Sequence, residues 1–370
     1  MSRYERHTLI DWFDQDRVGD ARIVVVGAGA IGNEVLKSLA LLGVGHISIF
    51  DFDRIEDHNL TRSVLFRESD VGRSKAEAAA AACSQIDPSI TCEPHCADFW
   101  DSLRLDDLAE ADAAICCVDN FEARQRINQL CMMAGTDLCN TGIDSRFASA
   151  ELFPFASAQP CACIECGWPD SVYEAISRRY TCGVLRRVGL KERKVPTTAV
   201  TSSIAGAMAV SMVLNRLHAH PHAPSGSFRC FTDTISFNSV RAELPQNADC
   251  PACTRYARGV ERMSAQRHCA LSPTIRCAGA GGVEVVLSEP VLLTTTCRLC
   301  GAESEHYESV RRKTAAVTVC AVCNEQSAEA TFAERLTLPD FERTFAGRRV
   351  PCKFVTCVSG TNEIVIEMEN

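Results

Sequence analysis

The sequence lacks three features that would place it in a special class of protein. Its first ten residues, MSRYERHTLI, contain no apolar core followed by a small-residue cleavage site, so we expect no signal peptide and a cytoplasmic protein. The longest apolar run, AVTSSIAGAMAVSMVL (199–214), is too short and too rich in Ser and Thr to span a membrane, and it predicts a buried helix. Positive charge is not in excess, because the net charge is −9. We therefore expect neither membrane insertion nor generic nucleic-acid binding.

What is present is an ordinary globular composition with a large number of cysteines. A length of 370 residues accommodates two domains at roughly 100–200 residues each. The chain has 22 cysteines, and without an export signal we interpret their abundance through metal ligation or catalysis rather than disulfides. Most of them, such as Cys116, Cys117 and Cys131, lie in apolar stretches and are interpreted as small core residues.

From residue 21 to about 145, apolar strands alternate with helices of about ten residues or more. Such alternation requires crossover connections and predicts a doubly wound α/β domain with a mostly parallel sheet. Its ligand is expected at the carboxyl ends of the strands. The expected strands are 23–26, 46–51, a segment around ITCEPHC and 113–119, and the expected helices are 31–42 and 74–84.

This alternation stops after residue 155. Residues 155–196, which include the basic segment SRRYTCGVLRRVGLKERKVP, are interpreted as a long loop that crosses the face carrying the active site. A helix at 198–217 and strands near 227–243 follow. Beyond them, the alternating runs VEVVL, AAVTVC and NEIVIEME predict a smaller β-rich domain. We therefore divide the chain into a first domain, 1–255, and a second domain, 256–370.

The stretch IVVVGAGAIG (23–32) predicts a phosphate site. A β-branched run that ends in G-x-G-x-x-G, here Gly27, Gly29 and Gly32, is typical of a buried strand, a tight turn and a helix whose first amides face an anion. Taken alone, the motif indicates NAD or FAD, and Asp51 lies 24 residues after Gly27, where a ribose-binding acid belongs. The motif predicts a nucleotide but leaves its chemistry open.

Polar and charged residues that follow the glycine turn indicate chemistry on phosphate. A dehydrogenase needs an apolar slot for the nicotinamide and has no evident use for an Arg, a Lys and a further Asp beside the phosphates. An enzyme that attacks the α-phosphate of ATP needs cations to neutralise the developing charge and a carboxylate to hold Mg²⁺. The residues concerned are Asp51, Asp53, Asn59, Arg62, Lys75 and Asp119, with Asn120 next to the last of them.

Four segments in this order resemble one protein family. GAGAIG, DFDRIEDHNLTR, DVGRSK and CCVDNFEAR are similar to the adenylation domain of ubiquitin-activating enzymes and their bacterial relatives, the adenylyltransferases of molybdopterin and thiamine sulfur-carrier proteins. The likeness covers roughly residues 1 to 255, and the ordered set is far more specific than any single motif. The resemblance implies that ATP is used to adenylate the C-terminal glycine of a ubiquitin-like protein.

By this resemblance each of these residues acquires an expected role. The three glycines shape the nucleotide turn, Asp51 holds the ribose hydroxyls, and Asp119 binds Mg²⁺. Asn59, Arg62 and Lys75 contact the phosphates, whereas Asp53 either faces the site or caps a helix. The full expected nucleotide-binding set is Gly27, Gly29, Gly32, Asp51, Asp53, Asn59, Arg62, Lys75 and Asp119.

Arg6 matches an arginine that the resembled family inserts into the site of a partner protomer. It lies in RYERH, where the family has RYxRQ, and it implies a homodimer. Two departures from the family pattern are Ala30, where many relatives have Gly, and Ser63, which replaces a frequent Gln. Neither removes a charge that the chemistry requires.

Two pairs of C-x-x-C segments predict zinc in the first domain and in the second. A two-residue gap lets both thiolates reach one tetrahedral ion. The first domain contains Cys163, Cys166, Cys250 and Cys253, a split site that the resembled family also has, with Cys161 as an alternative ligand. In the second domain only 19 residues separate the two segments, which is typical of a zinc ribbon. Its ligands are Cys297, Cys300, Cys320 and Cys323, and because four thiolates leave no open position we expect two structural zinc ions.

Cys182 is the expected nucleophile. It lies in RRYTCGVLRR, between two pairs of arginines, and cationic neighbours lower the pKa of a thiol. The catalytic cysteine of the resembled family, where present, occupies the corresponding place. The alternative is an ordinary loop thiol. The HAHPH segment (218–222) is interpreted as a solvated loop rather than a metal site.

These observations leave several functions open. In the first, the acyl-adenylate passes to Cys182 as a thioester and then to a conjugating enzyme, in a system whose stand-alone bacterial versions are associated with antiviral defence. In the second, a persulfide displaces AMP to give a thiocarboxylate on a sulfur-carrier protein. In the third, the chain is a non-catalytic scaffold that binds nucleotide, and a dehydrogenase is a distant fourth.

Overall fold

The computed structural model describes residues 3–157, 159–178, 197–256, 261–266, 282–310, 319–360 and 362–369. The chain divides into two compact units. The first consists of Met1–Trp168 and Lys194–Arg258, and the second of Pro169–Arg193 and Gly259–Asn370.

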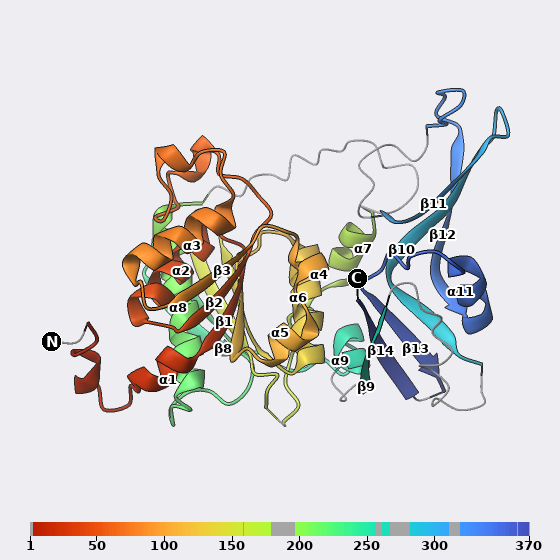
Figure 1. The fold of residues 1–370 in the computed structure, drawn as a ribbon. Helices are drawn as coiled ribbons and strands as arrows, with labels where there is room; N and C mark the ends of the chain where they lie inside the picture. The colour runs from red at the N-terminus through yellow and green to blue at the C-terminus, as the bar shows by residue number, and fades with distance from the viewer. Residues whose placement is uncertain are drawn as a thin grey trace. The chain divides into compact units, whose positions relative to one another are not determined.

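The first unit contains an eight-stranded sheet in the order β3-β2-β1-β4-β5-β6-β7-β8 (Figure 1). The strands β3, β2, β1, β4 and β5 run parallel, and β6, β7 and β8 continue the sheet in antiparallel pairs. The doubly wound, mostly parallel sheet expected from the sequence is therefore confirmed. The strands are β1 (Arg22–Val26), β2 (His46–Phe50), β3 (Thr91–His95), β4 (Ala113–Cys116), β5 (Asp137–Ile143), β6 (Phe147–Phe153), β7 (Phe228–Asp233) and β8 (Asn238–Glu243).

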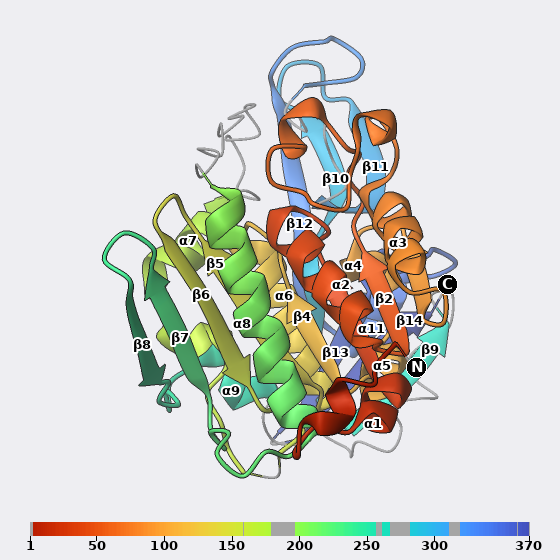
Figure 2. The same cartoon turned by 90° about the vertical axis from the view of Figure 1, so that its left-hand side faces the viewer.

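Helices cover both faces of this sheet (Figures 1 and 2). The helices α2 (Ala30–Leu42), α3 (Lys75–Ile86) and α8 (Ala199–Leu217) lie on one face. On the other lie α4 (Phe99–Ser102), α5 (Leu105–Ala109) and α6 (Phe121–Ala134). Because both faces are covered, β1 is buried from Ile23 to Val26, which explains its unbroken run of β-branched residues.

Shorter elements surround this core. The N-terminal segment forms η1 (His7–Leu9) and α1 (Gln15–Asp20), and the connection after β2 contains η2 (Asp57–Asn59) and η3 (Glu68–Asp70). The cysteine-rich segments form η4 (Ile164–Gly167) and α9 (Pro251–Tyr256).

Among the described residues, α8 is the one helix long and apolar enough to cross a membrane by length and composition. In the structure it packs on α2, β5 and β6, and Ala205, Ala209 and Val213 are almost inaccessible to solvent. This packing is that of a core helix, in agreement with the buried helix that the sequence predicts.

The second unit is built on a six-stranded sheet in the order β11-β10-β13-β14-β9, with β12 paired to β10. Most pairs are antiparallel, and β9 lies parallel to β14. Val285, Phe341 and Ile366 lie in its core. The elements are α7 (Asp170–Arg178), β9 (Glu261–Gln266), β10 (Glu284–Cys297), β11 (Glu303–Ser309), β12 (Ala328–Thr337), α11 (Leu338–Phe345), β13 (Phe354–Ser359) and β14 (Asn362–Glu369).

Two predictions from the sequence differ from the structure, and others concern residues outside the described ranges. The interpretation of 155–196 as one long loop is wrong for its first half, because η4 and α7 form there. The strand expected at 113–119 ends at Cys116, and the next residues turn toward α6. Most of the run AAVTVC, and Cys182 in the basic segment, lie outside the described residues.

Candidate nucleotide site and cysteine clusters

The glycine motif forms the turn between β1 and α2. Gly27 has a φ of 94°, and a Cβ there would lie 2.8 Å from the carbonyl oxygen of Cys117 on the neighbouring strand connection. A Cβ on Gly32 would lie 2.0 Å from the carbonyl oxygen of Gly27, so only glycine lets the helix approach the turn. Gly29 has open space beside it and precedes α2 without a side-chain cap. The first amides of α2 are thus free of a capping side chain, as an anion site requires.

Gly32 and Gly29 offer a matched pair of substitutions. In Gly32→Ala the new methyl group must displace backbone, so we expect a loss of about 1–3 kcal/mol in the free energy of unfolding, measured by urea denaturation. In Gly29→Ala the methyl group meets no protein atom within 4 Å, so stability should change little while ATP binding weakens. Equal stability of the two variants would contradict this account of the turn.

Asp51, directly after β2, ties the glycine turn to the neighbouring strand. Its carboxylate accepts hydrogen bonds from the amides of Ala28 at 2.7 Å and Asp53 at 2.8 Å. Burial raises the pKa of the Asp51 carboxyl, and the nearby Lys75 and the two amides oppose this rise. The residue therefore lies beside the turn, as expected of a ribose-binding acid.

Lys75 begins α3 and reaches the same edge of the sheet. Its ammonium group lies 2.7 Å from the carboxylate of Asp53, and its amide donates to the Asp53 carbonyl at 3.0 Å. The side chain of Lys75 is 12% exposed, whereas that of Asp53 is 53% exposed. Ser74, rather than Asp53, caps α3. Asp53 therefore orients the cation instead of capping the helix.

Asn59, the last residue of η2, and Arg62 lie in the connection between β2 and α3 and make local hydrogen bonds. The side-chain oxygen of Asn59 accepts from the amide of Glu56 at 2.9 Å, and Arg62 donates to the carbonyl of His58 at 2.7 Å. These bonds fold the connection. Their contacts with phosphate remain predictions.

Asn33, which is not among the residues predicted from the sequence, holds this connection against the glycine turn. Its amide group donates to the carbonyl of Ala28 at 2.7 Å, and its oxygen accepts from the amide of Leu65 at 2.9 Å. The residue is completely buried. A polar side chain inside the apolar first turns of α2 was the available signal, because a buried amide needs partners.

Asp119 projects from the turn after β4, next to the glycine motif in the strand order. It is exposed, and within the described part of the chain the hydrogen bond that its carboxylate accepts comes from Asn120 at 3.4 Å. Asn120 caps α6 by accepting from the amide of Ala123 at 2.9 Å. An accessible carboxylate is a suitable ligand for Mg²⁺, so the donor chemistry at Asp119 fits the expected ion.

Arg6 lies far from the glycine turn of its own chain. Tyr4, two residues earlier, is bonded to Asp87 at the end of α3 and adjoins Gly43 at the end of α2. The glycine turn is at the other end of α2, about 20 Å away at 1.5 Å per residue. Burial and the Asp87 carboxylate raise the pKa of Tyr4 to about 12. The structure therefore does not bring Arg6 to the other site residues, and its insertion into a partner remains a prediction.

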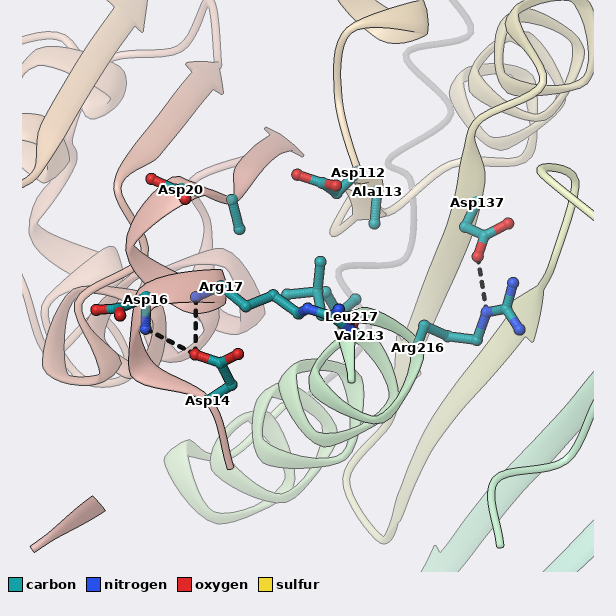
Figure 3. A pocket seen from close by; sticks show the side chains of 11 residues that line it. Asp14, Asp16, Arg17, Asp20, Asp112, Ala113, Asp137, Val213, Arg216 and Leu217 are labelled. Atoms are coloured by element: carbon teal, nitrogen blue, oxygen red, sulfur yellow. Dashed lines mark hydrogen bonds and ion pairs between the residues drawn. The ribbon is translucent and has the colours of Figure 1, made fainter. Parts of the chain in front are cut away.

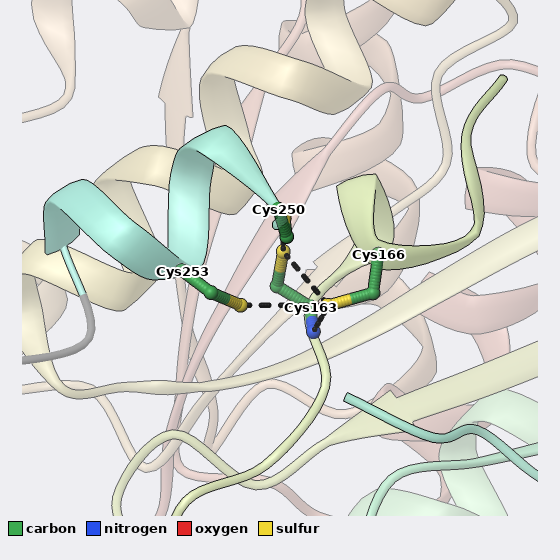
Figure 4. Close-up of side chains that lie close together, drawn as sticks. All are labelled: Cys163, Cys166, Cys250 and Cys253. Atoms are coloured by element: carbon green, nitrogen blue, oxygen red, sulfur yellow. Dashed lines mark hydrogen bonds between the residues drawn. The ribbon is translucent and has the colours of Figure 1, made fainter. Parts of the chain in front are cut away.

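Cys163, Cys166, Cys250 and Cys253 form one compact group (Figure 4). The sulfur atoms of Cys163 and Cys250 are 3.6 Å apart, and those of Cys166 and Cys253 are 3.4 Å apart. A tetrahedral zinc ion with bonds of about 2.3 Å places its sulfur ligands about 3.8 Å apart, whereas a disulfide requires about 2.05 Å. The group therefore fits a metal ion and not a pair of disulfides. Cys161 is not part of it.

The first cluster is fastened to α6, the helix that follows Asp119. Glu165, between two of the cysteines, is buried and accepts hydrogen bonds from Gln125 at 2.9 Å and Asn128 at 3.2 Å. Asn128 also accepts from the amide of Ile164 at 3.1 Å. A rigid metal site here would therefore support the middle of α6, the helix that begins at the nucleotide site.

Cys297, Cys300, Cys320 and Cys323 form a second group with the same geometry. The distance is 3.6 Å both between the sulfur atoms of Cys297 and Cys323 and between those of Cys300 and Cys320. Both groups could hold zinc, as the spacing predicts.

A cavity of about 550 Å³ lies at the other end of the parallel strands from the glycine turn (Figure 3). It adjoins the amino ends of β1, β4 and β5, where Ala21, Ala113 and Asp137 line it. Asp137 is ion-paired to Arg216 at 2.8 Å. Because nucleotides bind at the carboxyl ends of parallel strands, this cavity is not the nucleotide site.

Comparison with known proteins decides the family. The ThiF family model matches residues 4–252, which include the whole eight-stranded sheet and the expected nucleotide-binding residues from Gly27 to Asp119. This chain belongs to the ThiF family. The resemblance seen in the sequence motifs is thereby confirmed.

Members of this family with curated names are moderately similar to the chain. The molybdopterin-synthase adenylyltransferase of Salmonella typhimurium is 27% identical over 256 residues, which cover 68% of this chain and 96% of the relative. The SAMP-activating enzyme E1 of Haloferax volcanii is 29% identical over 257 residues, covering 68% of this chain and 88% of the relative. Ubiquitin-like modifier-activating enzyme 5 of Drosophila grimshawi is 30% identical over 215 residues. That match covers 55% of this chain and 52% of the enzyme, so the chain spans about half the length of this fruit-fly relative.

Among solved structures, a crystal structure of Escherichia coli MccB with ATP has the same fold as the first unit of this chain. Its TM-score is 0.55 at 24% identity, and the match covers 68% of this chain and 74% of MccB.

Proposed function

We propose that this chain uses ATP to adenylate the C-terminal carboxylate of a ubiquitin-like or sulfur-carrier protein. The observation that supports this most is the arrangement of three features on adjacent strands of a ThiF-family sheet. The glycine turn follows β1, Asp53 and Lys75 lie beyond β2 on one side, and Asp119 lies beyond β4 on the other. The Lys75 cation would thus lie on one side of an anion site at the glycine turn, and the accessible Asp119 carboxylate on the other.

The chain's own groups account for the first step. A carboxylate oxygen of the carrier attacks the α-phosphorus of ATP, and the bond from that phosphorus to the bridging oxygen breaks, so that pyrophosphate leaves. The α2 amides and Lys75 stabilise the charge on the phosphates, and Asp51 orients the ribose. Asp119 would hold Mg²⁺, which supplies further neutralisation of the phosphate charge when bound.

The proposed second step transfers the acyl group to Cys182. The thiolate attacks the acyl carbon of the adenylate, AMP leaves, and a conjugating enzyme then accepts the acyl group from the thioester. The similarity to ubiquitin-like modifier-activating enzyme 5 supports this route, and the similarity to molybdopterin-synthase adenylyltransferase supports the alternative, a thiocarboxylated carrier. A homodimer, in which Arg6 completes the partner's site, and a role in antiviral defence belong to the same proposal. Neighbouring genes for a ubiquitin-like protein, a conjugating enzyme and a metalloprotease would support it.

Cys182→Ala separates the two steps. We expect this variant to keep carrier-dependent ATP–pyrophosphate exchange within about twofold, because the adenylation residues are unchanged, and to lose the covalent enzyme–carrier adduct completely. Intact-protein mass spectrometry before and after hydroxylamine measures the adduct. Cys96→Ala, which removes an exposed thiol elsewhere in the chain, is the control. A thiocarboxylated carrier without any adduct would favour the sulfur-carrier route, and the absence of exchange with every carrier would favour a non-catalytic scaffold.

A further inference from the structure

A polar network with two buried members, Asn140 and Glu151, connects the turn that carries Asp119 with the antiparallel part of the sheet. We call it the Arg124 network, and it consists of Arg124, Asn140, Glu151 and Arg229. Arg124, in the first turn of α6, donates to the carbonyl oxygen of Val118 at 2.7 Å and to that of Thr141 at 2.6 Å. Its guanidinium group therefore ties the residue before Asp119 to β5.

Glu151 fixes the direction in which the Asn140 amide points. The amide nitrogen of Asn140 donates to Oε2 of Glu151 at 2.6 Å, and the amide oxygen of Asn140 accepts from Arg124. An ionised carboxylate only accepts hydrogen bonds, so it selects the nitrogen of Asn140 and leaves the oxygen for Arg124. Asn140 and Glu151 are each 6% exposed, so water does not readily replace either partner.

Arg229, on β7, places a positive charge beside the Glu151 carboxylate. Its Nε donates to Oε1 of Glu151 at 2.5 Å, and its side chain is 51% exposed. A buried carboxylate without a cationic partner would be protonated or would destabilise the fold. The network therefore runs from the Arg229–Glu151 ion pair through the Asn140 amide to the Arg124 guanidinium group.

We propose that Asn140 and Glu151 are positioning residues that, through Arg124, hold Asp119 in place for the metal ion on ATP. This inference rests on the adenylation function proposed above. Asp119 lies between two fixed points, the Val118 carbonyl bound by Arg124 and the Asn120 side chain that caps α6. If Arg124 no longer binds the Val118 carbonyl, then of these two points only the Asn120 cap holds the turn that carries Asp119.

Glu151→Gln tests the network without placing a new charge in the protein. Both neighbours of residue 151 present donors to it, and a glutamine has one acceptor oxygen where the carboxylate has two, so the direction of the Asn140 amide is no longer fixed. In the absence of nucleotide, we expect amide hydrogen exchange in a peptide covering residues 118–121 to accelerate about fivefold. In the presence of a carrier, kcat for ATP–pyrophosphate exchange should fall about tenfold, and the Mg²⁺ concentration for half-maximal rate should rise, while the KM for ATP changes less than about twofold.

Arg229→Gln removes the positive charge that pairs with Glu151 but keeps a donor for it, so it should change both measurements in the same direction and by less than Glu151→Gln does. The matched control is Arg241→Gln, which removes an exposed positive charge from β8, outside the network, and should leave both measurements unchanged. Asn140→Ser, which removes the link while leaving the Glu151–Arg229 pair, should reproduce the effects of Glu151→Gln and serves if that variant is unstable.

Folded Glu151→Gln and Asn140→Ser variants with unchanged hydrogen exchange and unchanged Mg²⁺ dependence would overturn the inference. Hydrogen exchange needs neither ATP nor a carrier. Failure of the network is therefore distinguishable from failure of the proposed function, which would appear as absence of ATP–pyrophosphate exchange in the unmodified protein.

Discussion

Replacement of Asp119 by alanine is expected to lower carrier-dependent ATP–pyrophosphate exchange about a thousandfold. The variant removes the accessible carboxylate at the carboxyl end of β4, and with it the residue expected to hold Mg²⁺ on the phosphates. Charge stabilisation that is aimed at a reacting phosphate is worth about 10²–10³ in rate when a single contributor is lost. The residue is exposed and makes one weak side-chain hydrogen bond among the described residues, so the fold should survive the change.

The control for this variant is Asp106→Ala, which removes an equally charged carboxylate, 79% exposed, on α5. It should leave exchange within about twofold and unfolding within about 0.5 kcal/mol of the unmodified protein. Equilibrium binding of ATP, measured with and without Mg²⁺, separates the effects further. Asp119→Ala should abolish the contribution of Mg²⁺ to binding. Retention of more than a tenth of the exchange activity would exclude Asp119 from the metal site.

Replacement of Cys250 by serine is expected to reduce bound zinc from two ions per chain to one and to destabilise the first unit severely. Cys250 is completely buried and joins a segment 84 residues away in the sequence, at Cys166, so the metal closes a long loop. Binding of zinc to four thiolates contributes about 10 kcal/mol or more to a fold that depends on it. Loss of one ligand should lower the melting temperature by on the order of 10–20 °C.

Zinc content by plasma mass spectrometry and thermal unfolding of the full chain measure this effect, with Cys161→Ser as the control. Cys161 is close in sequence to the cluster but outside it, so its replacement should leave two zinc ions and an unchanged melting temperature. If Cys250→Ser does not accumulate, release of zinc from the unmodified protein by a chelator gives the same information. Two retained zinc ions in Cys250→Ser would contradict the assignment.

Much of the nucleotide site was predictable because its signals are local in the sequence. The run Ile23–Val26 followed by the glycine motif specifies a buried strand and a tight turn. At Gly27 and Gly32 this turn has no room for a Cβ atom, so only glycine fits there. Asp51 was expected beside this turn because parallel strands end at one edge of the sheet, and it is bonded to Ala28 there.

Other parts of the fold had no such signal. The strands β5 and β6 contain Ala, Ser, Gly, Cys and Asn, which have little preference for strands, so these two strands are not predicted from the sequence. They form because β4 and α8 provide partners and cover on either side. Asn33 was overlooked for a similar reason, since its partner Leu65 lies 32 residues further along the chain.

The sequence by itself determined the glycine turn, the alternation of strands and helices that makes the sheet mostly parallel, the cysteine spacing and the family, because each depends on residues close together in the chain or on an ordered set of such motifs. Only the tertiary structure decided that Arg6 lies away from its own turn, that Asp53 orients Lys75, and that Glu151 and Arg124 meet at Asn140. These contacts join residues on separate strands and helices, and their formation depends on how the sheet and its helices pack rather than on any pattern within one segment.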